Sequence, residues 1–147
     1  MSESIKKIIF AGILLLTGCN NQMEQNDAEA YIRQTLDRQA ACWTNGDLDC
    51  FMDNYWKSDS LKFVGKSGIT YGWQATYDRY TKSYPDREAM GSLTFTVIDA
   101  EQTGPKNFFV LGKWQLDREE SEDVGGYFTL LWERIEGEWV IVTDHSS

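Results

Sequence analysis

Residues 28–43 have apolar and polar positions at the spacing of an α-helix. Apolar and small side chains recur at intervals of three or four residues from Ala28 through Ile32 to Trp43. This periodicity predicts an amphipathic helix with one buried face. Asn26, which is followed three positions later by Glu29, has the form of a capping box and is therefore expected to begin this helix.

The pattern predicts two further helices. The "TNG" sequence interrupts the first helix, and Asp47 can cap a second one that reaches Asp53 or Tyr55. A short strand is expected over "SLKFVG". A third helix should end at Pro85, because proline cannot continue a helix. That helix would carry four aromatic residues along one side: Trp73, Tyr77, Tyr80 and Tyr84.

Beyond the third helix the pattern changes to that of strands. Four runs are rich in β-branched and aromatic residues and are separated by turn residues, at 91–102, 107–117, 125–135 and 138–145. Sequential strands with short connections form antiparallel meanders. Helices followed by a long antiparallel sheet predict an α+β fold in which the helices cover one face of the sheet.

The last predicted hairpin can be given a register. If "EG" is a two-residue turn, counting outward pairs Trp132 with Ile141 and Phe128 with His145. Paired residues share a face of the sheet, and this face is the more aromatic one, so we place it under the helices. His145 is then expected to point inward and Asp144 to point away, unless a one-residue bulge near the strand end reverses them.

The N-terminus has the form of an export signal. Lys6 and Lys7 precede a short apolar run over 8–16, and small residues follow that run. The run is too short to span a bilayer and predicts a signal peptide over residues 1–18. The "LTGC" sequence resembles the lipobox of bacterial lipoproteins, which implies cleavage before Cys19 and lipid attachment to its thiol. An ordinary signal peptide and a buried N-terminal helix remain alternatives.

The export signal sets the expected domain organisation and location. Residues 19–26 are polar without an apolar pattern and are expected to form a tether, and residues 27–147 form one domain. Asn20 after the lipidated cysteine favours the outer membrane, so the domain would face the periplasm on its lipid anchor. Export also permits a disulfide between Cys42 and Cys50, although two buried thiols are an equally open alternative.

Composition and charge narrow the classes of partner. Aromatic residues make up 14% of the 147 residues, which predicts a compact core or a lined cavity. The formal charge of −9, without any basic patch, excludes a nucleic-acid partner, since a phosphate backbone needs clustered Lys and Arg. One histidine and two cysteines besides Cys19 do not make a metal site, and we expect no cofactor.

Three stretches together resemble a known family. They are "AACWTNGDLDCFMDNYWKSDSLKFVG", "YGWQATYDRY" and "GEWVIVTDHSS", and they resemble the SnoaL-like, nuclear transport factor 2-like domain from about Asp27 to Ser147. The resemblance implies a cone-shaped, curved antiparallel sheet wrapped on N-terminal helices, with a pocket between them and dimerisation through the outer face of the sheet. Members include ketosteroid isomerases, polyketide cyclases, dehydratases and non-catalytic binding domains, so the resemblance implies no single activity.

A pocket between helices and sheet would be lined mainly by aromatic residues, which suits a flat apolar ligand with one or two polar groups. The expected lining residues are Tyr55, Trp56, Phe63, Trp73, Tyr77, Tyr80, Trp114 and Trp132. His145 is the candidate general acid or base, because its ordinary pKa lies near neutrality. Asp53 and Asp59 are the candidate carboxylate partners of that histidine. A histidine that donates to a backbone carbonyl or a Tyr at the pocket rim is the structural alternative.

Three functions fit these expectations. The first is a lipid-anchored envelope domain that binds a small, partly hydrophobic molecule without transforming it. The second is an isomerase, cyclase or dehydratase that uses His145 as its acid or base. The third is an interaction module that forms a homodimer, or pairs with another envelope protein, through the outer sheet face.

Overall fold

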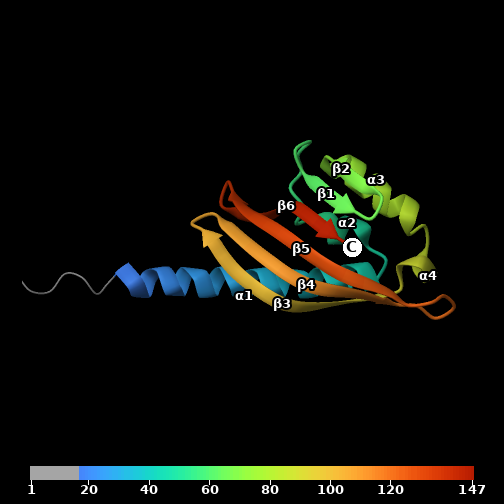
Figure 1. Cartoon of the computed structure of the whole chain (residues 1–147), viewed down its shortest axis with the longest axis horizontal. Helices are drawn as coiled ribbons and strands as arrows, with labels where there is room; N and C mark the ends of the chain where they lie inside the picture. The colour runs from blue at the N-terminus through green and yellow to red at the C-terminus, as the bar shows by residue number, and fades with distance from the viewer. Residues whose placement is uncertain (1–16) are drawn as a thin grey trace, which may run out of the picture.

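The computed structural model describes residues 17–147, with side chains from Asn26 onward (Figure 1). Most of the predicted signal peptide and the side chain of Cys19 therefore lie outside the described part. The helices are α1 (Thr17–Thr44), α2 (Leu48–Met52), α3 (Trp73–Ser83) and α4 (Arg87–Met90). The strands are β1 (Lys62–Gly65), β2 (Gly68–Tyr71), β3 (Ser92–Gly104), β4 (Asn107–Asp117), β5 (Val124–Ile135) and β6 (Glu138–Ser146).

The six strands form one curved sheet in the order β2-β1-β6-β5-β4-β3. Helix α1 runs along one face of this sheet and contacts β3, while α2 and α3 lie near the β1 and β2 end (Figure 1). The predicted α+β fold with a curved sheet on N-terminal helices is confirmed. One pairing differs from the prediction of an antiparallel sheet, because β1 runs parallel to β6. The sequence pattern also missed β2 and α4, each of which has only four residues.

Helix α1 begins earlier than the capping pattern predicts. The helix starts at Thr17 and continues through residues 19–26, which we expected to form an irregular polar tether. The predicted start at Asn26 is therefore wrong. Residues 19–26 contain neither proline nor glycine, so nothing in them interrupts a helix that continues from the strongly periodic segment.

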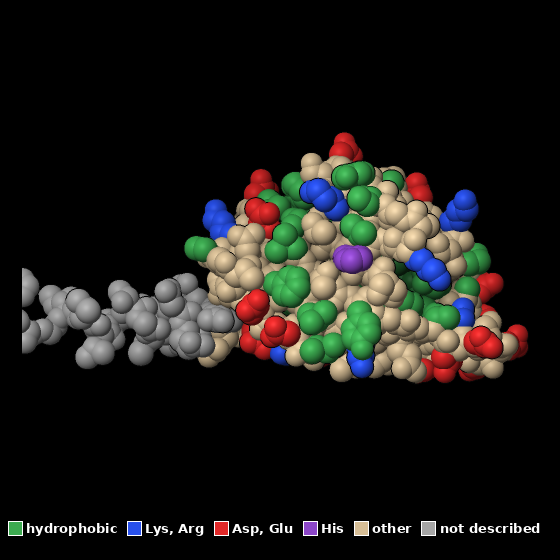
Figure 2. Space-filling view, viewed as in Figure 1, with side chains coloured by type: hydrophobic (Ala, Val, Ile, Leu, Met, Phe, Trp, Pro, Cys, Tyr) green, Lys and Arg blue, Asp and Glu red, His purple; other side chains and the backbone are tan. Residues whose placement is uncertain are grey.

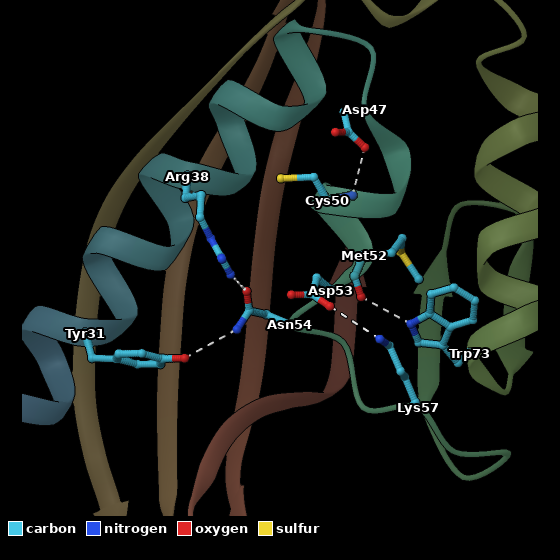
Figure 3. Close-up of polar contacts among 9 residues, drawn as sticks. All are labelled: Tyr31, Arg38, Asp47, Cys50, Met52, Asp53, Asn54, Lys57 and Trp73. Carbon is cyan, nitrogen blue, oxygen red and sulfur yellow. Dashed lines mark hydrogen bonds and ion pairs between the residues drawn. The ribbon is translucent and has the colours of Figure 1, made fainter.

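The turn between α1 and α2 is fixed by a cap and a covalent bond. Asp47 accepts a hydrogen bond at its Oδ1 from the backbone N–H of Cys50, at 3.0 Å, as the predicted cap requires (Figure 3). Cys42 and Cys50 form a disulfide with a Cα–Cα distance of 5.6 Å, which decides between the two alternatives left open by the sequence. Helix α2 is thus held against the end of α1.

Polar contacts fix the segment that follows α2 (Figure 3). Asn54 is buried, accepts a hydrogen bond from Arg38, and donates from Nδ2 to the Tyr31 hydroxyl at 3.5 Å. The Asn54 carbonyl accepts a hydrogen bond from the backbone N–H of Ile141, and the Ile141 carbonyl accepts one from the backbone N–H of Trp56. The chain leaving α2 is therefore held against β6, which places Tyr55 on the inner side of the sheet.

The hairpin between β5 and β6 starts in the predicted register. Glu136 and Gly137 both have positive φ, 52° and 90°, as expected for the tight turn of a two-residue hairpin. Trp132 pairs with Ile141 as predicted, but the next pair along the ladder joins Leu131 to Thr143, so Val142 is an extra residue on β6. This β-bulge shifts the rest of the strand by one position.

The bulge reverses the predicted orientation of the last residues. Asp144 is 3% exposed and points inward, whereas His145 is exposed. The prediction that His145 points inward and Asp144 points away is therefore wrong. Because side chains alternate along a strand, one extra residue is enough to exchange the two faces.

The core lies between the helices and the inner face of the sheet. Its fully buried large side chains include Ile32, Leu36, Phe108, Trp132 and Ile141. Within residues 17–147, no helix is long enough and apolar enough to cross a membrane.

Candidate functional site

A cavity of about 520 Å³ opens between the inner face of the sheet and helices α1 to α3. Its size is within the usual range of small-molecule sites. Most of the wall is apolar, and the residues that line it include Trp43, Phe51, Tyr55, Phe63, Tyr80, Tyr84, Leu93, Phe95, Trp114, Leu116, Phe128 and Leu130. Figure 2 shows a hollow with hydrophobic side chains on this side of the molecule, with Lys or Arg side chains at its edge.

The wall is built from rings that pack edge to face. The Trp43 ring lies 4.9 Å from Tyr84 and 5.6 Å from Tyr80, measured between ring centroids. On the sheet side, Phe95 and Phe128 are 5.2 Å apart in the same arrangement. Such contacts restrict how far the rings can move, so the cavity has a defined shape.

A carboxyl and phenol pair occupies the closed end of this cavity. The Tyr55 hydroxyl donates to Oδ2 of Asp144 at 2.6 Å, and the Ser146 hydroxyl donates to Oδ1 at 2.8 Å. Both Tyr55 and Asp144 are 3% exposed. Tyr55 comes from the segment after α2, and Asp144 is turned inward by the bulge at Val142. Two elements far apart in the sequence thus build the pair.

Burial raises the pKa of Asp144 above its ordinary value of 3.8. The hydrogen bonds from Tyr55 and Ser146 favour the carboxylate and act against this rise, as does nearby His145. Asp144 is therefore a carboxyl group with a weakened preference for ionisation that still faces an open cavity. Groups of this kind can exchange a proton with a bound molecule.

The two phenols near Asp144 are held in their neutral form. Burial raises the pKa of Tyr55 well above 10.0, and the negative charge of Asp144 raises it further. Burial and Asp144 likewise raise the pKa of Tyr80, whose hydroxyl interacts with that of Tyr55. Tyr80, Tyr55 and Asp144 therefore form a short chain of polar groups inside an otherwise aromatic wall.

The mouth of the cavity carries positive charge. Arg79 on α3, Lys66 between β1 and β2, and Arg118 after β4 all line it. The Arg79 guanidinium lies 4.9 Å from the centre of the Phe63 ring. Burial raises the pKa of Tyr84, while the charges of Arg118 and Arg79 act against that rise, so both guanidinium groups lie within electrostatic reach of its hydroxyl.

The structure brings together half of the predicted pocket residues. Tyr55, Phe63, Tyr80 and Trp114 line the cavity, whereas Trp56, Trp73, Tyr77 and Trp132 do not. Trp73 instead donates from Nε1 to the Met52 carbonyl at 3.1 Å and stacks on Tyr77. Trp132 is fully buried, and its indole N–H has no hydrogen-bond partner among the described residues. These side chains serve packing.

The structure does not bring the predicted acid–base residues together. His145 is exposed and does not line the cavity, and Figure 2 shows the histidine on the surface of the molecule. Asp53 is exposed and pairs with Lys57 at 3.3 Å. Asp59 is also exposed and lies beside Gly72. Neither aspartate shares a site with the histidine in this arrangement.

Sequence reasoning missed both aromatic and charged residues of the cavity. The aromatic ones include Trp43, Phe51, Tyr84, Phe95 and Phe128. Asp144 was placed on the outer face because the register was extended without the bulge. Arg118 gave no signal, since an isolated arginine in a loop is usually solvated. One signal was available for Arg79, because it lies on the same predicted helix as Tyr80, one residue away.

Candidate metal ligands do not gather among the described residues. No group of three or more His, Cys, Asp or Glu side chains between residues 17 and 147 has the geometry to hold a metal ion. The chemistry that this site offers is hydrogen bonding to a polar group at Asp144 and Tyr55, apolar contact along the wall, and positive charge at the mouth.

Comparison with solved structures identifies similar chains. A nuclear transport factor 2-like protein of unknown function from Shewanella oneidensis MR-1 shares 39% sequence identity, over 79% of this chain and 95% of that chain, with a TM-score of 0.74. A nuclear transport factor 2-like protein of unknown function from Pseudomonas putida KT2440 is 17% identical, over 83% of this chain and 87% of that one, with a TM-score of 0.66.

A ketosteroid isomerase-like protein from Erwinia carotovora atroseptica SCRI1043 has a similar structure at 14% identity. It is matched over 83% of this chain and 96% of that chain, with a TM-score of 0.65. At this identity the similarity shows a common fold alone. No protein-family model matches the sequence, and no curated protein matches it.

Proposed function

The chain belongs to the nuclear transport factor 2-like family. We propose that it binds a small, partly hydrophobic molecule in the cavity between its helices and its sheet. A polar group of that molecule would bind Asp144 and Tyr55 at the closed end. The observation that most supports this proposal is a cavity of about 520 Å³ whose largely aromatic wall contains the buried carboxyl and phenol pair of Asp144 and Tyr55.

The proposal rests on the energetic cost of such a pair. A buried carboxyl group destabilises a fold unless it is hydrogen-bonded, and a core built only for stability would hold an apolar side chain there. Asp144 keeps two donors, from Tyr55 and Ser146, and still faces the cavity. A ligand hydroxyl placed there would complete its hydrogen bonding.

The test uses 2-naphthol, a flat aromatic molecule with one hydroxyl group. Isothermal titration calorimetry should show one molecule bound per chain. Leu93→Trp fills the cavity from β3 and should abolish binding. Ile98→Trp is the matched control, because Ile98 lies on the same strand but is 51% exposed; this variant should bind normally. Circular dichroism of both variants verifies the fold. Absence of binding to the wild-type chain, or equal binding by L93W, contradicts the proposal.

A second candidate function is proton transfer by Asp144. The observation that favours it is that Asp144 lines a cavity open to a ligand and that burial raises its pKa above the ordinary value. The carboxylate would take a proton from a carbon next to a carbonyl group and return it to another carbon, so that the substrate isomerises. Neutral Tyr55 and Tyr80 would serve as donors nearby.

This candidate is tested with a β,γ-unsaturated cyclic ketone, whose conjugated isomer absorbs more strongly in the ultraviolet. Asp144→Asn should lower the rate at least about 100-fold. His145→Ala should leave the rate unchanged, because His145 lies outside the cavity. An undiminished rate in D144N would show that Asp144 does not transfer the proton. A lost rate in H145A would show that His145 takes part in the reaction.

For the location of the protein we propose a lipid anchor at Cys19 on the periplasmic side of the cell envelope, with the outer membrane favoured. The support is the basic, apolar and "LTGC" sequence at residues 6–19. Labelling growing cells with radioactive palmitate should label the wild-type chain and leave Cys19→Ser unlabelled. Equal labelling of both chains contradicts the anchor.

We also propose that the domain forms a homodimer through the outer face of the sheet. The support is the exposure of large apolar side chains, with Ile98 at 51% and Tyr127 at 54%. Sedimentation equilibrium should show a dimer at micromolar concentration and a weaker one for Tyr127→Lys. A strict monomer excludes this arrangement.

A further inference from the structure

The positive charge at the cavity mouth stands out in an acidic protein. The chain has 14 Lys and Arg against 23 Asp and Glu. Yet the described residues that line the cavity include three cationic side chains, Lys66, Arg79 and Arg118, and a single acidic one, Asp144. Asp144 is deeply buried, whereas Lys66 is exposed and the two arginines are half-buried. The cavity therefore has its acidic group in the buried part and its cationic groups at the entrance.

Arg79 is held at the entrance by the strand beneath it. Its guanidinium lies over the Phe63 ring, 4.9 Å from the centroid. A Cβ atom on Gly65 would lie only 2.6 Å from Arg79 Nη2, so the absence of a side chain at this position lets the guanidinium lie close to β1. Its position is therefore defined by packing rather than by an acidic partner.

Arg118 is held from the other side of the entrance. Its Nε donates to the Glu122 carbonyl at 2.8 Å, and its backbone N–H donates to Asp123 Oδ1 at 2.9 Å. The Glu122 carbonyl, a neutral acceptor, thus orients the guanidinium, while the bond to Asp123 fixes the backbone. The Tyr84 hydroxyl lies within electrostatic reach of both arginines, and both arginines line the cavity.

None of the three cations has an ion-pair partner in the part of the chain that the structure describes. Ion pairs do occur elsewhere in that part, between Arg33 and Glu29 and between Lys57 and Asp53. Two guanidinium groups that line a largely apolar cavity, neither of them in an ion pair among the described residues, form an arrangement that attracts an anion. Arginine also presents a planar fork that matches a carboxylate group.

We infer that the ligand of this cavity is a small amphiphilic carboxylate, whose apolar body fills the aromatic wall and whose anionic group binds Arg79 and Arg118 at the mouth. This inference rests on the proposed binding function and names the chemical class of the ligand. Lys66 adds positive charge at the rim. A hydrogen-bonding group at the opposite end of the ligand would reach Asp144 and Tyr55.

The test compares two probes of nearly equal shape, 2-naphthoate, which is ionised at neutral pH, and 2-naphthamide, which is neutral. Calorimetry on the wild-type chain should show about tenfold to hundredfold tighter binding of 2-naphthoate, since hydrogen bonds to charged groups contribute about 1.5–3 kcal/mol. The double variant Arg79→Gln, Arg118→Gln should reduce this preference to less than about threefold, mainly by weakening the binding of 2-naphthoate.

Lys82→Gln is the matched control for the loss of positive charge. Lys82 lies on α3, three residues from Arg79, is exposed and does not line the cavity. It should keep the full preference for 2-naphthoate. If K82Q loses the preference as the double variant does, the effect comes from net charge and the inference is overturned.

The outcomes separate the two proposals. If the wild-type chain binds both probes equally and L93W abolishes both, the cavity is a binding site but the carboxylate inference fails. If the wild-type chain binds neither probe, both the inference and the proposed function fail. The comparison of probes on the wild-type chain needs no variant, so an unfolded double variant does not prevent the decision.

Discussion

Asp144 is the residue on which most of this account depends. It is a carboxyl group among aromatic rings, it has donors in Tyr55 and Ser146, and burial raises its pKa. The sequence misplaced it because the register of the last hairpin was extended without the bulge at Val142. Local sequence rules often fail at functional sites, which supports the proposed role of Asp144 in binding.

The raised pKa of Asp144 makes a prediction about stability and pH. The folded chain keeps this carboxyl protonated to a higher pH than the unfolded chain does. Above pH 3.8 the folded state therefore keeps more bound protons than the unfolded state does, so the free energy of unfolding falls as the pH rises. Asp144→Asn removes this titration. The melting temperature of D144N relative to the wild type should increase from pH 3.5 to pH 7. A difference that stays constant, or decreases, contradicts the burial of an ionisable group.

Removal of the Tyr55 hydroxyl should shift the same carboxyl. Tyr55→Phe takes away the donor at 2.6 Å that favours the carboxylate, so the pKa of Asp144 should rise further, as followed by carbon-13 NMR of the carboxyl carbon. The unfolding free energy should fall by about 1–3 kcal/mol, because a buried acceptor loses its partner. Tyr71→Phe is the control, since Tyr71 is 60% exposed. An unchanged pKa in Y55F shows that the bond does not matter.

At the scale of elements, the helices and strands follow the sequence pattern except where contact with a segment distant in the sequence changes them. The third helix ends before Pro85, Asp47 caps the second helix, and the last hairpin turns at the predicted residues. The bulge at Val142 was not predictable from the hairpin alone. It lies where β6 passes from pairing with the segment after α2 to parallel pairing with β1, and neither contact is visible in the alternation of β6.

Deletion of Val142 should undo the bulge. The continuous register would turn Asp144 outward and leave the Tyr55 hydroxyl buried without its acceptor. We expect the unfolding free energy to fall by more than about 2 kcal/mol and the affinity for 2-naphthol to be lost. Val142→Ala keeps the number of residues in β6 and is the control, which should keep the bulge and bind 2-naphthol. If the Val142 deletion folds and binds normally, the bulge does not set the site.

The disulfide should stabilise the junction of α1 and α2. It closes a loop between residues separated by eight positions, for which chain entropy gives a stabilisation of about 2–3 kcal/mol. Urea unfolding of the double variant Cys42→Ala, Cys50→Ala should show a loss of about this size. Dithiothreitol should lower the stability of the wild type and leave the double variant unaffected; equal sensitivity of the two chains would mean that the bond does not contribute.

At the scale of the whole molecule, the chain is a curved sheet that holds a cavity against its helices, with a polar closed end and a cationic mouth. The aromatic content predicted a core or a lined cavity, and the structure contains both. Which aromatic residues serve which purpose was not predictable, because Trp114 and Trp132 alternate on neighbouring strands in patterns that look equivalent in the sequence. Trp132 is fully buried in the core, whereas Trp114 lines the cavity.

The most direct test of the central claim is the carbon-13 signal of the Asp144 carboxyl during titration with 2-naphthol, assigned by its absence in D144N. We expect the signal to shift until one molecule is bound per chain, and not to shift in L93W. Binding of 2-naphthol that leaves the Asp144 signal unmoved would contradict a ligand site at Tyr55 and Asp144.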